Sequence, residues 1–165
     1  MKYFNGFSLF GEEKLFSNLI EEESITGFSY GAIKAFEYAL ANNCKKLTLI
    51  SPAFFQLKDK KFKKLQTLSF KKSQKSYIDN FLKSCAYPSS QNISKYLKLG
   101  TAEQLEELLD FYWDRNKLES LVANGCKITI HIGSKDAIVS KEEIENFFKD
   151  VADIIVYKGK GHILQ

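Results

Sequence analysis

The chain has 165 residues, of which 44% are hydrophobic, so it can build one sizeable core, whereas two independent domains would each be marginal. Its formal net charge is only +4, and it lacks the run of about 18 apolar residues that a membrane span needs. The first ten residues contain no small-residue cleavage site, so we expect a cytoplasmic protein without a membrane partner.

The cysteines argue against a disulfide framework or a zinc site. Cys44, Cys85 and Cys126 are an odd number and show no Cys-x-x-Cys spacing. We therefore expect buried thiols, and neither a metal nor another cofactor.

Strand and helix patterns alternate along much of the chain. The expected elements are a strand at 2–5, a helix at 12–22, a strand at 24–26, a helix at 32–41, strands at 46–50 and 127–132, a helix at 141–149 and a strand at 154–157. The apolar positions expected to face the core in the first two helices are Leu15, Phe16, Leu19 and Ile20, and Ile33, Phe36, Tyr38 and Leu40. Because parallel neighbours need a crossover connection, this alternation predicts an α/β fold with about five parallel strands.

Residues 53–123 interrupt the alternation with several helical patterns and no convincing strand. We predict a helical cap inserted between the third and fourth strands, on a core made of residues 1–52 and 124–165. The aromatic residues Phe111, Tyr112 and Trp113 either line a ligand cavity in this cap or pack helix against helix.

A Gly-Phe-Ser-Tyr-Gly pentapeptide at residues 27–31 separates an expected strand from an expected helix. The Gly-x-Ser-x-Gly pattern is typical of a sharp turn that exposes a reactive serine, here Ser29. A side chain at either glycine would collide where the backbone doubles back. The pentapeptide alone also fits a helix N-cap serine between loop glycines.

A nucleophilic serine needs a base, usually histidine, and the histidine needs a carboxylate that fixes its tautomer. Of the two histidines, His131 alternates with isoleucines inside an expected strand, so its side chain points to one face of the sheet. His162 follows the last strand in a glycine-rich loop, and Asp136 follows the fourth strand. We predict a catalytic triad of Ser29, Asp136 and His162, in the chain order of an α/β-hydrolase.

Acyl transfer also needs N–H donors for the oxyanion, each worth on the order of 3 kcal/mol. The N–H of Tyr30, directly after Ser29, is the first expected donor. The loop after the first strand occupies the place of the second donor, and we assign it to the N–H of Phe7.

These segments resemble the α/β-hydrolase superfamily over nearly the whole chain outside the insertion. The matching motifs are Asn5-Gly6-Phe7, which is similar to the family's His-Gly-x oxyanion turn, the turn at 27–31, residues 132–136, and Gly161-His162. The short length and the stretches at 3–7, 27–35 and 161–165 resemble, more narrowly, the small BioV-type esterases of biotin biosynthesis. This resemblance implies a serine esterase that hydrolyses the methyl ester of pimeloyl-acyl carrier protein.

The chain departs from the superfamily pattern in two respects. Asn5 stands in place of the usual histidine, and the chain begins where the pattern has its third strand. If every crossover steps to the adjacent strand, right-handed connections put all the helices on one face of the sheet. We expect the other face to be covered by a second copy of the protein, as a homodimer, or by repositioned cap segments.

A basic block carries eight lysines against the single acid Asp59: Lys58, Lys60, Lys61, Lys63, Lys64, Lys71, Lys72 and Lys75. Such a block favours an acidic partner by long-range attraction. The resemblance to the BioV-type esterases implies that this partner is an acyl carrier protein. We predict that it docks on the lysines of the block from Lys58 to Lys72. The alternative is a solvated basic helix face. Nucleic acid is not expected, because arginine and stacking aromatics are scarce in the block.

Two other functions stay open. One is a general short-chain carboxylesterase or thioesterase without a carrier partner. The other is a degenerate hydrolase that acts as a binding module, against which the complete set of Ser29, Asp136 and His162 argues.

Overall fold

The computed structural model describes residues 1–165 and contains one parallel sheet of five strands in the order β1-β2-β3-β4-β5. The elements are β1 (Lys2–Phe4), the 3-10 helix η1 (Glu12–Phe16), β2 (Ser24–Phe28), α1 (Tyr30–Ala41), β3 (Lys46–Ile50), α2 (Lys60–Lys72), α3 (Gln74–Ala86), the 3-10 helix η2 (Ser94–Tyr96), α4 (Ala102–Asp110), α5 (Arg115–Ala123), β4 (Lys127–Gly133), α6 (Lys141–Phe148) and β5 (Asp153–Tyr157). Each strand pairs in parallel with its neighbour in the sequence. The expected five-stranded parallel sheet is confirmed.

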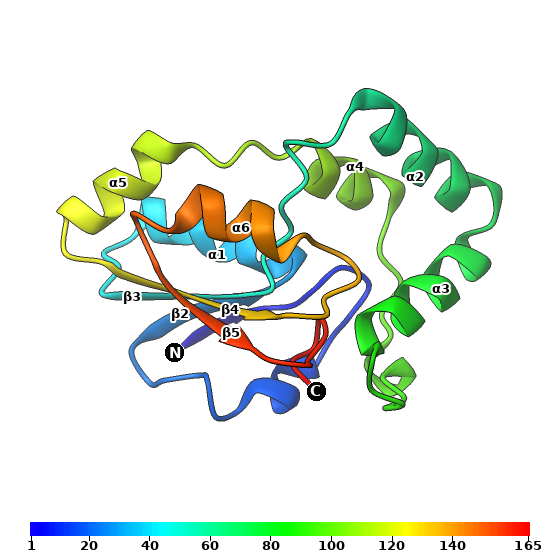
Figure 1. Ribbon diagram of the computed structural model, residues 1–165, viewed down its shortest axis with the longest axis horizontal. Helices are drawn as coiled ribbons and strands as arrows, with labels where there is room; N and C mark the ends of the chain where they lie inside the picture. Colours follow the sequence, from blue (N-terminus) through cyan, green and yellow to red (C-terminus); the bar gives the residue numbers. More distant parts are fainter.

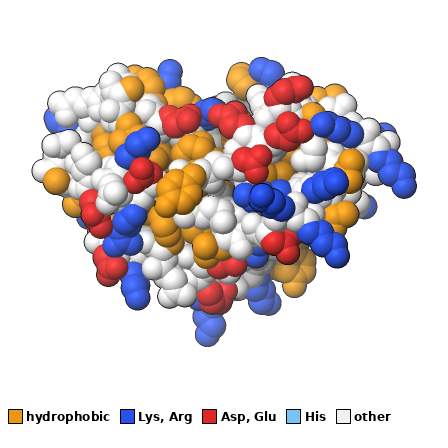
Figure 2. Space-filling view, turned by 90° about the horizontal axis from the view of Figure 1, so that it is seen from above, with side chains coloured by type: hydrophobic (Ala, Val, Ile, Leu, Met, Phe, Trp, Pro, Cys, Tyr) orange, Lys and Arg blue, Asp and Glu red, His pale blue; other side chains and the backbone are white.

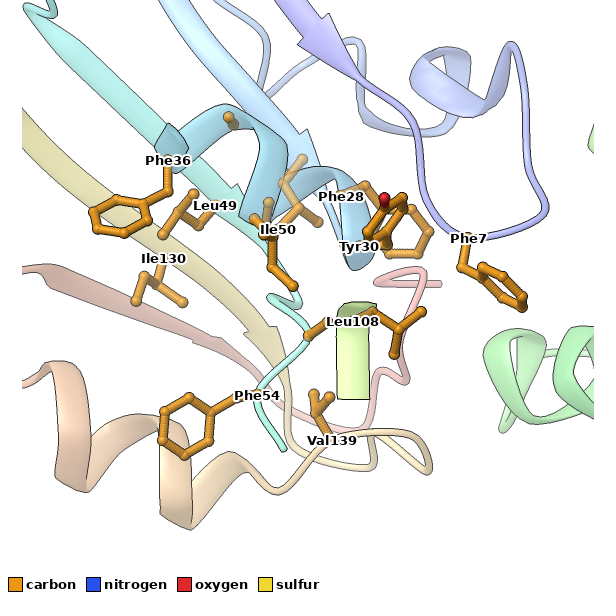
Figure 3. Close-up of a cluster of buried hydrophobic side chains, with 14 of the residues drawn as sticks. Phe7, Phe28, Tyr30, Phe36, Leu49, Ile50, Phe54, Leu108, Ile130 and Val139 are labelled. Atoms are coloured by element: carbon orange, nitrogen blue, oxygen red, sulfur yellow. The ribbon is translucent and has the colours of Figure 1, made fainter. Parts of the chain in front are cut away.

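One face of the sheet carries α1, α5 and α6, which lie above the strands in Figure 1. This is the arrangement expected when crossovers of one hand connect adjacent strands. Leu49 and Ile130, paired in adjacent strands, are fully buried beneath this layer. Figure 3 shows their side chains pointing toward Phe36 of α1. Burying each such side chain contributes about 1.5–3 kcal/mol, so this layer is the main stabilising core.

Helix α1 starts two residues earlier than expected and turns a different face inward. Tyr38 and Leu40 are exposed, while Ala32, Ala35 and Ala39 are buried. The buried set follows the three- and four-residue spacing of a helical face, whereas residues 38 and 40 lie off that face. The predicted core positions Ile33 and Phe36 are confirmed, and the prediction that Tyr38 and Leu40 face the core is wrong.

The helix expected at 12–22 is wrong in type and length. Only the 3-10 helix η1 forms, after Gly11 in a left-handed conformation (φ 79°), and turns follow it. The hydroxyl of Ser24 donates to the Glu21 carbonyl at 2.8 Å, so a turn takes the place of further helix. Phe16 still reaches the core and packs on Phe28, with ring centroids 4.9 Å apart.

The sheet face opposite α1 is partly covered by the chain itself. Phe28, Ile50 and His131 lie side by side on adjacent strands and are buried. The η1 segment lies below the sheet in Figure 1, on the side away from α1. Toward the edge strand, Ile155, which is next to His131, is 44% exposed. A second copy over this edge stays a prediction.

Helices α2, α3 and α4 stand beyond the carboxyl ends of the strands (Figure 1), whereas α5 contacts α1 and β4. The division into a core and a cap at 53–123 stays a prediction. Trp113 is fully buried, donates through Nε1 to the Ala53 carbonyl at 2.9 Å and packs against Phe36. Tyr112 is 70% exposed. Trp113 therefore packs in the core and does not line a ligand cavity.

Each helix is either too short or too polar to cross a membrane. All three cysteines are buried free thiols, as expected. The pair Cys44 and Cys126 precedes the adjacent strands β3 and β4, and burial raises the pKa of both thiols.

Candidate active site

Ser29 occupies the turn between β2 and α1 in a conformation that L-residues rarely adopt, with φ 54° and ψ −115°. Such a backbone costs of order 1–3 kcal/mol and persists only where the surroundings impose it. Ser29 precedes the helix, but its side chain makes no capping hydrogen bond. The N-cap interpretation of this serine therefore does not hold, and its hydroxyl faces a pocket.

The two glycines of the pentapeptide are sterically required. A Cβ at Gly27 would lie 2.1 Å from the carbonyl oxygen of Gly31. A Cβ at Gly31 would lie 2.0 Å from the carbonyl oxygen of Phe4, at the end of β1. Both distances are far shorter than a carbon–oxygen contact allows, so the turn forms only with glycine at these positions.

Asp136 and His162 come together at the carboxyl ends of β4 and β5. His162 Nδ1 lies 2.7 Å from Asp136 Oδ2, and both side chains are almost completely buried. The other carboxylate oxygen, Oδ1, accepts the backbone N–H groups of Ile138 at 2.8 Å and Val139 at 3.0 Å. Because an ionised carboxylate only accepts, the imidazole carries its proton on Nδ1, which leaves Nε2 as an acceptor.

His162 Nε2 is buried and has no hydrogen-bond partner. No hydrogen bond joins it to Ser29, although the imidazole packs in a tilted arrangement against Phe28, the residue before Ser29, with ring centroids 5.0 Å apart. Catalytic hydrogen bonds often close only when substrate is bound. The structure thus forms the Asp136–His162 half of the predicted triad directly and leaves the basic nitrogen unsatisfied.

Backbone contacts fix the His162 loop. The Ser51 hydroxyl donates to the His162 carbonyl at 2.7 Å. A Cβ at Gly161 would lie 1.6 Å from the carbonyl oxygen of Tyr87, and one at Gly133 would lie 2.3 Å from that of Gly161. The loops after β4 and β5 and the end of α3 therefore interlock around His162.

The two predicted oxyanion donors lie on segments that touch. The N–H groups of Phe7 and Tyr30 make no hydrogen bond within the chain. Gly6 packs so closely on the Phe28 ring that a Cβ would come within 2.8 Å of it. Phe7 and Ser29 line the same pocket, and the oxyanion role of the two N–H groups stays a prediction.

A pocket of about 600 Å³ opens at Ser29 and extends between α2, α3 and α4. Its apolar lining includes Phe7, Phe81 and Leu108. Besides Ser29, the polar side chains of the lining come from α2, α3 and the residue between them; they are the charged Lys72 and the uncharged Gln66, Ser69, Ser73, Ser76, Asn80 and Ser84. No three His, Cys, Asp or Glu side chains gather as they would around a metal ion.

Helix α4 is tied to the serine turn by a polar contact. The Tyr30 hydroxyl donates to Glu107 Oε2 at 2.5 Å, and Lys34 pairs with the other oxygen of the same carboxylate. Burial, and then the Glu107 hydrogen bond, raise the pKa of Tyr30 to about 12. The residue after Ser29 thus connects α1 to the wall of the pocket.

The eight lysines of the basic block, seven of which are the predicted docking residues, divide into two groups. Four of the eight form ion pairs, namely Lys58 with Glu143, Lys63 with Asp110, Lys71 with Glu106 and Lys75, outside the docking prediction, with Asp79. The other four, Lys60, Lys61, Lys64 and Lys72, are exposed on α2 and pair with no carboxylate. Figure 2 shows lysine and arginine side chains gathered at the end of the molecule where α2 and α3 lie in Figure 1.

Three residues with contacts near the site are not among the residues that the sequence predicted. They are Ser51, which donates to the His162 carbonyl, Glu107, which accepts the Tyr30 hydroxyl, and Glu12, which is completely buried. Each acts through a contact more than five residues away in the chain, for which local patterns carry no signal.

No family model matches the chain, and comparison with curated proteins gives no match. Solved structures do resemble it. They include a hydrolase from Oleispira antarctica (TM-score 0.64, 17% identity, 93% of this chain and 63% of that one). Another is the naproxen esterase, carboxylesterase NP, of Bacillus subtilis (TM-score 0.57, 16% identity, 91% of this chain and 57% of that one). A third is an alpha/beta hydrolase fold protein from Burkholderia ambifaria (TM-score 0.57, 16% identity, 92% of this chain and 63% of that one).

The chain has the α/β-hydrolase fold, as the motifs predicted. It spans between 57% and 63% of the length of these three solved chains. At identities of 16–17% the likeness concerns the fold, and the chemistry must be argued from the residues of this chain.

Proposed function

We propose that this protein is a serine esterase that hydrolyses a carboxylic ester through an acyl-enzyme. The observation that carries the proposal is the buried Asp136–His162 pair, whose free Nε2 belongs to the same site as a strained serine turn. A strained backbone, an unsatisfied buried nitrogen and a pocket at the hydroxyl each have a cost that a purely structural site would avoid. The names of the structural neighbours, several of them carboxylesterases, support the same reaction class.

In this mechanism His162 Nε2 takes the proton of Ser29 as Oγ attacks the ester carbonyl. The N–H groups of Phe7 and Tyr30 stabilise the negative charge on the carbonyl oxygen. The alcohol leaves with the proton from Nε2, and an acyl group remains on Ser29. Water then gives a proton to Nε2 and attacks the acyl carbon, and Ser29 recovers the proton as the acid departs. Asp136 holds the tautomer and stabilises the imidazolium throughout.

The substrate that we propose is the methyl ester of pimeloyl-acyl carrier protein, used in biotin biosynthesis. The motifs at 3–7, 27–35 and 161–165 support it by resemblance, and methanol is then the leaving group. The pocket at Ser29 combines aromatic and aliphatic side chains with hydroxyl and amide side chains from α2 and α3. Such a mixed lining suits an acyl chain that continues into a carrier arm with amide groups.

The docking surface for the carrier is proposed on α2. Lys61, Lys64, Leu65, Leu68 and Lys72 follow a spacing that puts them on one helix face, and both leucines are about half exposed (52% and 51%). The lysines have no carboxylate partner in the chain, so their charge is available to an acidic protein. Exposed leucines between them offer the apolar contact that charge alone lacks.

The first experiment tests the chemistry. A serine-reactive fluorophosphonate should label Ser29, and Ser29→Ala should lose both labelling and hydrolysis of a p-nitrophenyl ester, with kcat falling on the order of 10⁵-fold or more. Ser120→Ala, on α5 and outside the pocket lining, is the matched control and should keep both. Labelling of another residue, or no labelling of a folded protein, would support the binding-module alternative instead.

The second experiment tests the carrier. Lys61→Glu with Lys64→Glu should lower kcat/KM for a carrier-linked methyl ester roughly tenfold, chiefly through association, and leave a small soluble ester unaffected. Lys117→Glu with Lys149→Glu makes the same charge change at exposed positions outside α2 and should change neither. Equal turnover of the carrier ester by both double variants would favour a general esterase or thioesterase without a carrier partner.

A further inference from the structure

Glu12 is a charged residue with no exposed surface. Its Oε1 accepts the backbone N–H of Gly6 at 2.6 Å and the hydroxyl of Tyr3 at 3.3 Å. Its Oε2 is buried and has no partner. Burial raises the pKa of Glu12, against the Gly6 hydrogen bond, which lowers it.

A buried carboxylate with one unsatisfied oxygen is costly, and a leucine of similar size would avoid that cost. The proposed mechanism gives Glu12 no part, since Ser29, Asp136 and His162 carry the proton transfers. The contact that distinguishes Glu12 is its short hydrogen bond to Gly6, one residue before the proposed oxyanion donor Phe7.

The two hydrogen bonds of Gly6 together orient the peptide that carries the Phe7 N–H. Glu12 holds the Gly6 N–H, and the Gly6 carbonyl accepts the N–H of Leu9 at 3.2 Å. That carbonyl belongs to the same planar unit as the Phe7 N–H, and in a trans peptide the two point in opposite directions. Asn5 closes the loop by accepting the Gly11 N–H at 3.2 Å.

We propose that Glu12 is a positioning residue for the oxyanion hole: its carboxylate holds the Gly6 N–H and so fixes the direction in which the Phe7 N–H donates. This inference rests on the proposed esterase function. The carboxylate does not contact the reacting atoms. It acts through the loop between β1 and η1, and its value to the reaction is that Phe7 does not have to reorient when charge develops.

The variants separate positioning from stability. Glu12→Gln keeps an oxygen that can accept the Gly6 N–H, whereas Glu12→Leu removes the acceptor and keeps most of the volume. Tyr3→Phe is the matched control, because it removes the other donor to the same oxygen and leaves Gly6 untouched. Thermal unfolding of each variant shows whether the protein is folded at the assay temperature.

With a p-nitrophenyl ester, we expect Glu12→Leu to lower kcat about 10²-fold with KM nearly unchanged, the effect of losing one oxyanion donor. Glu12→Gln and Tyr3→Phe should stay close to the parent. A folded Glu12→Leu with the parent kcat overturns the proposal. So does a loss of kcat that is equal in all three variants or that follows the unfolding temperature.

A readout that does not need activity keeps this test apart from that of the esterase. Amide hydrogen exchange measured by NMR should show Gly6 protected in the parent and in Glu12→Gln and unprotected in Glu12→Leu. An unchanged Gly6 exchange rate in Glu12→Leu overturns the positioning role. If Gly6 exchange changes as expected but the parent protein hydrolyses no ester, the esterase proposal is refuted. The hydrogen bond between Glu12 and Gly6 is then still established.

Discussion

Helices α1 and α2 have nearly the same length and bury very different amounts of themselves. Seven residues of α1 are buried, among them Ile33 and Phe36, whereas α2 buries Phe70 alone. Helix α1 follows the serine turn directly and packs on β1, β2 and β3, so any shift of this helix would move Ser29. Helix α2 lines the pocket and exposes lysines and leucines to solvent. In the proposed esterase, the core therefore holds Ser29 in place, and α2 carries the surface proposed for carrier docking.

The largest expected effect lies on the core side of this comparison. Asp136→Asn keeps an oxygen for the Ile138 and Val139 N–H groups but turns a donor toward His162 Nδ1, so the imidazole takes the wrong tautomer. We expect kcat for a small ester to fall about 10⁴-fold. Asp79→Asn, on α3, should have no such effect. A variant that retains a tenth of the parent kcat would contradict the assigned role of Asp136.

A pair of identical substitutions tests the difference in stability. Leu49→Ala leaves a cavity in the fully buried sheet layer and should cost about 2–5 kcal/mol of unfolding free energy. Leu68→Ala on the exposed face of α2 should change it by no more than about 0.5 kcal/mol. Urea unfolding measures both. Similar costs at the two sites would mean that α2 is as much a part of the stabilising core as β3.

A smaller effect is expected where the two regions meet. Glu107→Ala removes the acceptor of the Tyr30 hydroxyl and the partner of Lys34. Because these contacts are partly exposed, the free energy of unfolding should fall by about 1 kcal/mol or less. Hydrogen exchange of residues 102–110 should nevertheless rise, because α4 loses its tie to the serine turn. Glu103→Ala, on the same helix without an ion pair, should leave that exchange unchanged.

The smallest expected effect is the pH dependence of stability that His131 causes. This histidine is buried, and its Nδ1 forms a hydrogen bond with the Tyr157 hydroxyl at 3.0 Å. Burial lowers the pKa of His131 below its ordinary 6.5, so the unfolded chain binds the proton more readily than the folded one. Its contribution to stability is therefore present above pH 6.5 and is lost as the pH falls through the lower folded pKa. The free energy of unfolding should be lower at pH 5 than at pH 7 by about 1 kcal/mol or less, and this difference should be absent in His131→Leu. An equal drop in that variant would assign the acid sensitivity to other groups.

The elements that sequence patterns predicted well are those that the residues of the segment itself mark, wherever their partners lie in the chain. Strands β3 and β4 were expected almost residue for residue, because alternation and a following Ser-Pro or Gly mark them locally. The helix expected at 12–22 failed because its apolar residues reach the core from turns. Composition could not show that Glu12 would be buried, because its partners Tyr3 and Gly6 come from β1 and from the loop that follows it.

The sequence by itself determined the turn at Ser29, the parallel sheet and the order of serine, aspartate and histidine, since glycine sterics, side-chain periodicity and strand ends are local properties. Tertiary structure alone decided which lysines of α2 are free, that the imidazole presents a buried and unsatisfied Nε2, and that Glu12 holds the loop of Phe7. Those features depend on contacts between distant segments, whose distances and burial exist only once the chain has folded. Five residues of sequence are enough to predict the serine turn, but the side chains that surround it come from segments throughout the chain.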